Sequence, residues 1–224
     1  MRDITENPDG IFAAKTPGLT LINMSTNSVK YTKELTSKCF REGIRFIACP
    51  VSGSKTSAER GELLLMAGGD KDDVEKNKNL LLSMGKSIIY AGVQEKAAAL
   101  KLCVNLILAH LTTAICESSA LCTNLGLKEE ILFESLEKSP ALSCPYFSLK
   151  KPKILNSDYF PEFALKNMLR DVRLILAEAK DKKQNLPVTD AVEKLLLKSC
   201  NAGNGDYDLS IIMKTLETLK TERI

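Results

Sequence analysis

The sequence lacks the features that would direct a protein to nucleic acid or into a membrane. Its 31 basic and 28 acidic residues leave a formal net charge of only +3, and no basic block is longer than residues 150–153. Nucleic acid is therefore not indicated as a partner. The most apolar stretch, residues 102–116, contains Asn105 and His110 and is shorter than the roughly 18 to 20 residues that span a bilayer. We expect this stretch to form a buried helix, and we expect no membrane association.

Two further absences concern location and metal binding. The residues after Met1 are polar, where a targeting signal would have an apolar core. The seven cysteines are odd in number, and no pair of them has metal-ligand spacing. Because most of them lie within apolar runs, we expect reduced, buried thiols in a cytoplasmic protein without a metal site.

What is present divides the chain into two parts. Up to Gly92, short apolar segments alternate with helical ones, which is typical of an α/β layer with mostly parallel strands. We predict strands at 19–23, 45–51, 63–67 and 88–90. Helices are predicted at 28–42 and at 70–84, the second capped by Asp70 and ended by Gly85.

After Gly92 the pattern is helical throughout. The predicted helices are 95–125, 128–138, 163–183, 187–202 and 209–222. We therefore predict an α/β domain over residues 1–93 and an all-α domain over residues 94–224.

The helix predicted at 95–125 has apolar residues at nearly every azimuth. A helix that is apolar all round is buried all round. A chain of this size could not easily enclose such a helix alone, so we expect a second subunit to cover it in a homodimer. His110, nine residues after Lys101, falls on the opposite face, where a core histidine with a satisfied ring is expected.

Lys101 and Asn105 lie four positions apart on this helix, so their side chains project from one face, one turn apart. Two interpretations are open. The pair could reach the same ligand, or the lysine could extend to solvent while the asparagine bonds to a neighbouring helix.

Four motifs follow one another in the order typical of a known enzyme family. Residues 19–26 end in Ser25-Thr26, and residues 49–53 read Cys-Pro-Val-Ser-Gly. Gly92 precedes Lys101 and Asn105, and Phe163 precedes Arg170-Asp171. Over nearly its whole length the chain resembles the β-hydroxyacid dehydrogenase family, which includes 3-hydroxyisobutyrate dehydrogenases and glyoxylate/succinic semialdehyde reductases. The resemblance implies a partial, doubly wound Rossmann domain followed by an all-α domain of the 6-phosphogluconate dehydrogenase-like type.

The resemblance also implies an activity, the transfer of a hydride between NAD or NADP and a short hydroxy or oxo acid. Such a reaction needs a base at the substrate hydroxyl, and Lys101 is the candidate because burial would disfavour its charged form. Asn105 would orient the same hydroxyl, while Ser52 and the backbone around Gly53 would bind the substrate carboxylate. The implied cofactor-binding residues are Thr26, Phe163, Arg170 and Asp171.

The sequence departs from the family pattern in two places near these residues. Glu95 and Ala97 stand where the family usually has glycines, and Arg170 stands where it usually has a lysine. A planar guanidinium does not substitute freely for the point charge of an ammonium group. Asp171 has two interpretations, since it could orient a group of the site or pair with a nearby basic residue.

The largest departure is a missing motif. The Gly-x-Gly-x-x-Gly turn that holds the pyrophosphate does not occur, and Gly203-Asn204-Gly205 lacks the third glycine and follows a helical segment. The sequence thus carries no motif that chooses between NAD and NADP. The alternatives to an enzyme are a truncated, noncatalytic relative that serves as a dimerising scaffold or partner subunit, and a fragment of a longer gene product.

Overall fold

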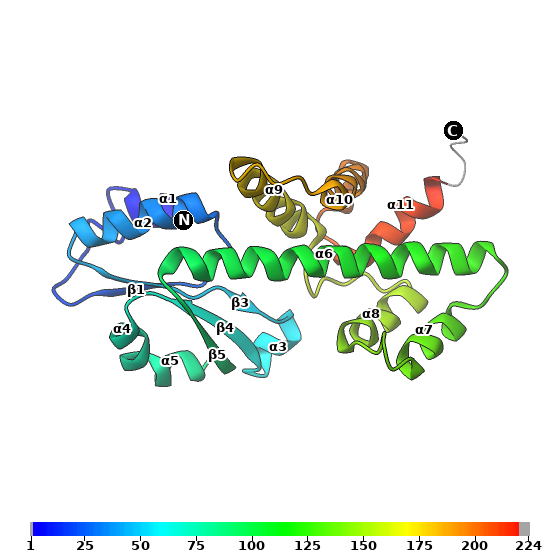
Figure 1. Ribbon diagram of the computed structural model, residues 1–224, viewed down its shortest axis with the longest axis horizontal. Coiled ribbons are helices and arrows are strands. Elements are labelled where there is room, and N and C mark those ends of the chain that lie inside the picture. Colours follow the sequence, from blue (N-terminus) through cyan, green and yellow to red (C-terminus); the bar gives the residue numbers. More distant parts are fainter. Residues whose placement is uncertain (1, 220–224) are drawn as a thin grey trace. The chain divides into compact units, whose positions relative to one another are not determined.

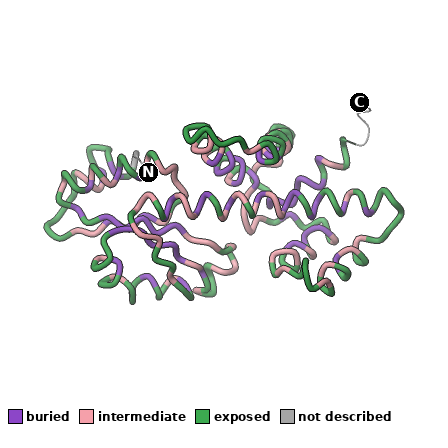
Figure 2. The backbone as a smooth tube through the Cα atoms, viewed as in Figure 1, coloured by how far each residue is buried: buried purple, intermediate pink, exposed green. Residues whose placement is uncertain are grey.

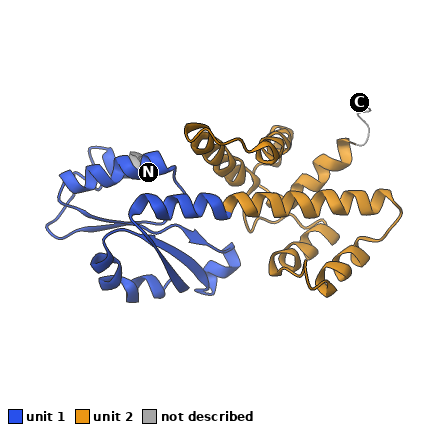
Figure 3. Ribbon diagram, in the orientation of Figure 1, with its two compact units in different colours: residues 1–104 blue, residues 105–224 orange. Residues whose placement is uncertain are grey.

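The computed structural model describes residues 2–219 and divides into two compact units, residues 1–104 and residues 105–224 (Figure 3). The division falls inside one continuous helix, α6 (Gln94–Asn124), and not at residue 93. The α/β pattern ends at residue 92 as the sequence indicates, but the helix that follows belongs to both units. Each unit has its own apolar core.

The first unit is built on a five-stranded sheet (Figure 1). Its strands are β1 (Thr20–Asn23), β2 (Arg45–Ala48), β3 (Val51–Ser52), β4 (Leu63–Gly68) and β5 (Gly85–Gly92). The strand order is β1-β2-β4-β3, with β5 also paired to β4. The pairs β1–β2 and β4–β5 are parallel.

The sheet is less parallel than the sequence led us to expect, because β4 runs antiparallel to both β2 and β3. The ten residues 53–62 join β3 to β4, and a parallel crossover needs about a dozen or more residues. These ten residues form the short helix α3 (Lys55–Glu59) and return the chain alongside β3.

Helices cover both faces of this sheet, as in a doubly wound fold (Figure 1). On one face, Leu35 and Cys39 of α2 (Val29–Arg41) pack with Phe46. On the other face, Val74 of α4 (Lys71–Lys76) and Leu81 of α5 (Lys78–Leu82) pack with the neighbouring residue of β2, Ile47. Adjacent residues of a buried strand therefore supply two separate cores.

Local signals set the ends of these helices. Ser28 Oγ accepts a hydrogen bond from Tyr31 N at the start of α2, and Asp70 Oδ1 accepts from Asp72 N and Asp73 N at the start of α4. The predicted helix 70–84 is interrupted at Asn77, which ends α4 and begins α5. Gly85 begins β5, where an added Cβ would lie 2.4 Å from Leu63 O. Its role is close strand packing and not helix termination.

A second close approach fixes the start of α6 against the sheet. A Cβ at Gly68 would lie 2.6 Å from Val93 O and 2.8 Å from Ala97 Cβ. Gln94 Nε2 also donates to Phe46 O at 2.8 Å. The first glycine of the Gly68-Gly69 pair is thus required by the packing of α6 on β4.

The second unit is helical. Besides the greater part of α6 it contains α7 (Glu129–Lys138), α8 (Pro145–Leu155), α9 (Leu165–Asp181), α10 (Pro187–Ser199) and α11 (Ile212–Leu219). A π-helical turn (Cys200–Asn204) and a 3-10 turn, η2 (Leu209–Ile211), lie between the last two helices. The sequence did not predict α8, nor the short N-terminal helix α1 (Arg2–Glu6).

Helix α6 is only partly enclosed by the chain, and Figure 2 shows buried and exposed residues alternating along it. Ile107 and Leu121 are each 58% exposed. By length and composition alone α6 could cross a membrane, with 44% of its most apolar window buried inside the structure. Its apolar surface is therefore larger than the single chain covers, which agrees with the expectation that a chain of this size does not enclose the helix alone.

Candidate active site

The predicted pair Lys101 and Asn105 lies on α6 with both side chains withdrawn from solvent. Lys101 is 8% exposed and Asn105 is 1% exposed. A lysine that extends to solvent would be far more exposed than this. The structure therefore excludes the interpretation in which Lys101 extends to solvent.

Asn105 is anchored by Asp171 of α9. Its Nδ2 donates a hydrogen bond to Asp171 Oδ2 at 2.7 Å. The carboxylate can only accept, so the amide orientation is fixed, with nitrogen toward Asp171. Asn105 is thus bonded to a neighbouring helix, as the second interpretation of the pair proposed.

The oxygen of the same amide has no hydrogen-bond partner among the residues that the structure describes, although it is buried. Buried polar atoms of folded proteins are nearly always paired, because an unpaired one costs about 1–3 kcal/mol. Asn105 Oδ1 is an acceptor, so its complement is a hydroxyl or an ammonium group and not a carboxylate. This atom is ready to receive a ligand donor.

Asp171 is fully buried and holds two neighbours at once. Its Oδ1 accepts from Arg170 Nε at 3.0 Å and from Arg170 Nη2 at 2.8 Å, while Oδ2 holds Asn105. Both interpretations offered by the sequence therefore apply, since Asp171 orients a polar group and pairs with a base. The arginine side chain is 55% exposed and has three further N–H groups beyond the two it donates to Asp171.

The segment around Ser52 and Gly53 lies in the first unit, at the end of β3. Ser52 is partly exposed. Gly53 has φ 148°, and a Cβ there would lie 2.7 Å from Leu63 Cδ2. Only glycine fits this turn, which leads into α3.

The remaining predicted residues are partly exposed and lie at the ends of elements. Thr26 follows β1 in the first unit. Phe163 belongs to the second unit, in the segment 156–164 that joins α8 to α9, and it packs against the core there. The structure thus places Thr26, Ser52, Gly53 and Lys101 in the first unit.

A buried ion pair close to Phe163 was not predicted from the sequence. Lys150 Nζ of α8 lies 2.6 Å from Asp208 Oδ1, and both side chains are almost completely buried. Burial by itself would raise the pKa of Asp208, but the charge of Lys150 and hydrogen bonds from Lys150 and Ser210 lower it. In the sequence, Lys150 is one of several lysines in a basic block, and nothing there distinguishes it.

His110 has the role expected of a core histidine. Its Nε2 lies 3.0 Å from the hydroxyl of Thr189 on α10, and burial lowers the pKa of the imidazole. Among the described residues no group of three or more His, Cys, Asp or Glu side chains is placed to hold a metal.

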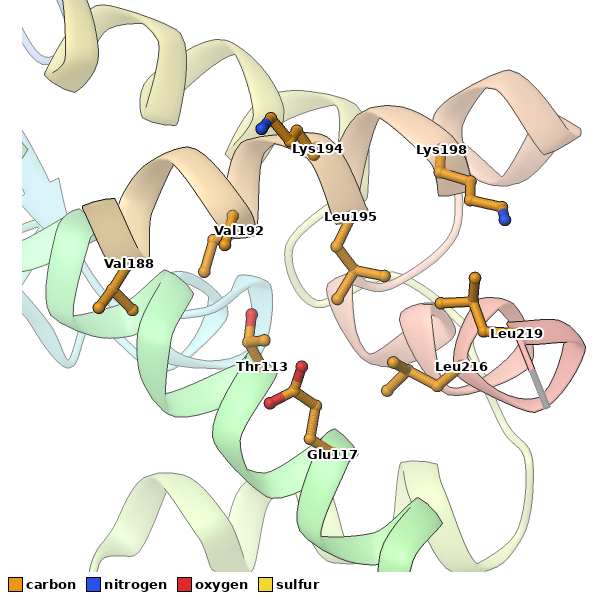
Figure 4. A pocket seen from close by; sticks show the side chains of 10 residues that line it. Thr113, Glu117, Val188, Val192, Lys194, Leu195, Lys198, Leu216 and Leu219 are labelled. Atoms are coloured by element: carbon orange, nitrogen blue, oxygen red, sulfur yellow. The ribbon is translucent and has the colours of Figure 1, made fainter. Parts of the chain in front are cut away.

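A hollow of about 370 Å³ in the second unit lies apart from these residues (Figure 4). Leu195 of α10 and Leu216 of α11 face its interior, and Thr113 and Glu117 of α6 lie beside it. It contains none of the predicted site residues.

The fold defines a class of two-part protein, a Rossmann-like α/β unit joined through one helix to an all-α unit. Comparisons with known proteins agree. Residues 1–92 match the NAD binding domain of 6-phosphogluconate dehydrogenase, and residues 96–216 match the NAD-binding domain of NADP-dependent 3-hydroxyisobutyrate dehydrogenase. The chain therefore belongs to the β-hydroxyacid dehydrogenase family, whose cofactor is NAD or NADP.

Individual relatives support this assignment. The chain is 32% identical to glyoxylate/succinic semialdehyde reductase 2 of Arabidopsis thaliana, over 98% of its own length and 61% of the relative. It is also 32% identical to reductase 1 of the same plant, over 93% and 72% of the two chains. The solved 3-hydroxyisobutyrate dehydrogenase of Mycobacterium tuberculosis with L-serine is 26% identical, with a TM-score of 0.81 over 92% of this chain and 72% of that one.

Proposed function

We propose that this chain performs the chemistry of an NAD(P)-dependent β-hydroxyacid dehydrogenase or reductase, with Lys101 as the acid/base. The observation that carries the proposal is the buried amide of Asn105. Asp171 holds its nitrogen, and its oxygen is buried and unpaired among the described residues. A substrate hydroxyl one helical turn from a buried lysine fits that free acceptor.

The roles follow from what each group can donate or accept. When bound, the nicotinamide supplies or takes the hydride at the substrate carbon. Lys101 holds or releases the proton of the substrate oxygen, because an amine can act in both directions. Asn105 Oδ1 accepts the hydroxyl proton in a hydrogen bond as the substrate binds, and the hydroxyl then turns that one proton to the Lys101 amine, one helical turn away, for the transfer. Asp171 is a positioning residue, since it touches Asn105 and not the reacting atoms.

Three residues would hold the nicotinamide end of the cofactor. Thr26 follows β1, Phe163 offers a partly exposed ring, and Arg170 retains N–H groups that Asp171 does not use. The Thr26 hydroxyl and the Arg170 N–H groups are donors that fit ribose hydroxyls or a phosphate. The 224 residues hold no Gly-x-Gly-x-x-Gly turn for the pyrophosphate, and the chain spans 61% of one plant reductase and 72% of the other.

The substrate would be a short hydroxy or oxo acid. Ser52 and the backbone at Gly53 would bind its carboxylate, because glycine leaves the backbone open to close approach. The names of the relatives suggest the compounds to test: glyoxylate, succinic semialdehyde, 3-hydroxyisobutyrate and L-serine.

A homodimer would cover the apolar surface that the single chain leaves open. Ile107 and Leu121, fourteen positions apart on α6, lie on one side of the helix, about four turns from each other. Leu125 and Ile131 continue this surface around a hollow of about 320 Å³ between α6 and α7. Light scattering should give twice the chain mass, and Leu121→Glu should give the mass of one chain.

Calorimetric titration with NADH and with NADPH, followed by assays of the named compounds, tests the proposed activity. Lys101→Ala should abolish turnover and preserve cofactor binding. Lys96→Ala is the matched control, because Lys96 is an exposed lysine of the same helix. A folded protein that binds neither cofactor would refute the enzyme and favour a noncatalytic, dimerising relative.

A further inference from the structure

A buried carboxylate outside the proposed catalytic residues organises the loop that carries Phe163. This loop, residues 156–164, joins α8 to α9. Asp208 Oδ2 accepts hydrogen bonds from Glu162 N at 3.1 Å and from Phe163 N at 3.3 Å. These two amides lie just before α9, and Asp208 Oδ2 is an acceptor that they share.

The other oxygen of Asp208 is bound from the opposite side. Its Oδ1 accepts from Lys150 Nζ at 2.6 Å, from Ser210 Oγ at 2.7 Å and from Ser210 N at 3.0 Å. The carboxylate is fully buried. Each oxygen therefore has a separate set of donors, and the plane of the carboxylate is fixed.

Backbone bonds around Asp208 tie down the same region. Asp208 N donates to Tyr159 O at 2.9 Å, and Leu209 N donates to Phe163 O at 3.0 Å. The neighbouring carbonyl of Tyr207 accepts from Leu165 N at 2.9 Å. The segment that holds the loop also caps the first turn of α9, the helix that carries Arg170 and Asp171.

A second buried lysine of α8 acts on the loop directly. Lys153, three residues after Lys150 on α8, donates from Nζ to Phe160 O at 2.7 Å. One face of α8 thus supplies two buried ammonium groups to this region, while Lys151 points away to an exposed partner, Glu137. The spacing of three places Lys150 and Lys153 on the same side of the helix.

The geometry points to Asp208 as a positioning residue of the proposed cofactor site. Asp208 holds the 156–164 loop so that Phe163 faces the cofactor, and Lys150 is the counter-charge of Asp208. The inference rests on the proposed function for Phe163. It assigns Asp208 no contact with substrate or cofactor.

Two single substitutions separate positioning from stability. In Asp208→Asn the remaining oxygen must stay with the Lys150 ammonium, so the new NH2 group faces the N–H groups of Glu162 and Phe163. The loop then loses its acceptor. In Lys150→Met the carboxylate remains, and the loop keeps its acceptor. Both variants break a buried ion pair, and both should unfold at a lower temperature.

The measurements are amide hydrogen exchange and fluorescence titration with NADH and NADPH. Asp208→Asn should speed exchange at Glu162 and Phe163 and weaken cofactor binding, each by about tenfold. Lys150→Met should change both by less than about twofold at a similar loss of thermal stability. Lys151→Met, which removes an exposed pair of the same helix, should change neither quantity.

The outcomes decide between explanations. Equal effects of Asp208→Asn and Lys150→Met on binding would show that lost stability is the cause and would overturn the inference. Unchanged exchange at Glu162 and Phe163 in Asp208→Asn would overturn it as well. If the unmodified chain binds neither cofactor, the proposed function fails, and the exchange data alone still decide whether Asp208 holds the loop.

Discussion

Removing the Asp171 carboxylate should lower the stability of the protein and leave the Asn105 amide without a fixed orientation. Asp171→Ala leaves Asn105 Nδ2 buried without its acceptor, which costs about 1–3 kcal/mol. Loss of the Arg170 contacts adds only about 0–1 kcal/mol, because the guanidinium is half exposed and regains water. We expect the free energy of unfolding to fall by about 1–4 kcal/mol in total.

The same change should lower kcat more than it raises KM for the substrate. An amide that can rotate no longer directs the substrate hydroxyl toward Lys101, and such misplacement costs up to about a hundredfold in rate. Asp171→Asn keeps one acceptor oxygen in the same shape, so its loss of stability and its loss of rate should both be smaller.

Urea unfolding followed by circular dichroism provides the assay, and the control lies on the same helix. Arg173 Nε is 2.9 Å from Glu193 Oε1 in an ion pair whose arginine is 53% exposed, so Arg173→Ala should cost about 0–1 kcal/mol. If Asp171→Ala were no more destabilising than Arg173→Ala, the argument that Asp171 anchors a buried amide would be wrong.

Three other predictions concern titration and reactivity. The Lys150 charge and the hydrogen bonds from Lys150 and Ser210 outweigh burial and lower the pKa of Asp208, so its stabilisation is complete above about pH 4 and is lost as the pH falls through the lowered value. Urea unfolding between about pH 5 and pH 2 should therefore depend less on pH in the Lys150→Met/Asp208→Asn double variant, and an unchanged dependence would contradict this. Burial lowers the pKa of His110, so the single imidazole signal in NMR should titrate below about pH 6.5. The free energy of unfolding should fall as the pH is lowered and the buried histidine is forced to take up a proton. A titration midpoint at or above about pH 6.5 would show that the ring is not buried as described. Burial raises the pKa of Cys39 and of Cys49 to about 11, whereas Cys103 is exposed, so a thiol reagent should label Cys103 first, and Cys103→Ser should remove the fastest phase.

The sequence predicted those parts of the fold that depend on local pattern. The cap at Asp70 and the long helix after Gly92 are visible in residue type and period alone. Helix α8 was missed because Pro152 lies inside it, and an interior proline normally argues against a helix. The burial of Lys150 and Ile154 against the rest of the unit outweighs that preference.

The antiparallel pairing of β4 depends on contacts between strands that local pattern does not encode. Alternation and length identified the segment 63–67, but its direction relative to β2 is set by the ten-residue return through α3. The break at Asn77 is likewise a tertiary adjustment, because α4 and α5 each place one apolar residue, Val74 or Leu81, in the same core.

For the candidate site, helical spacing and family resemblance identified Lys101, Asn105 and Asp171. Spacing could not reveal that Asp171 holds Asn105 from 66 positions away in the chain, or that the amide oxygen remains unpaired. Asp208 and Lys150 went unnoticed because a charged residue in a polar stretch is normally exposed. Their burial is a property of the folded unit.

The continuity of α6 has a consequence for anyone who recombines parts of this family. The boundary between the compact units lies between Val104 and Asn105, so a chimera joined there would take Lys101 from one parent and Asn105 from the other. It would also place a junction in the middle of a 31-residue helix. The better joints are the positive-φ glycines at either end, Gly92 and Gly126, because an exchange between them moves α6 as one piece. A chimera joined at these two glycines would take Lys101 and Asn105 together from the same parent protein.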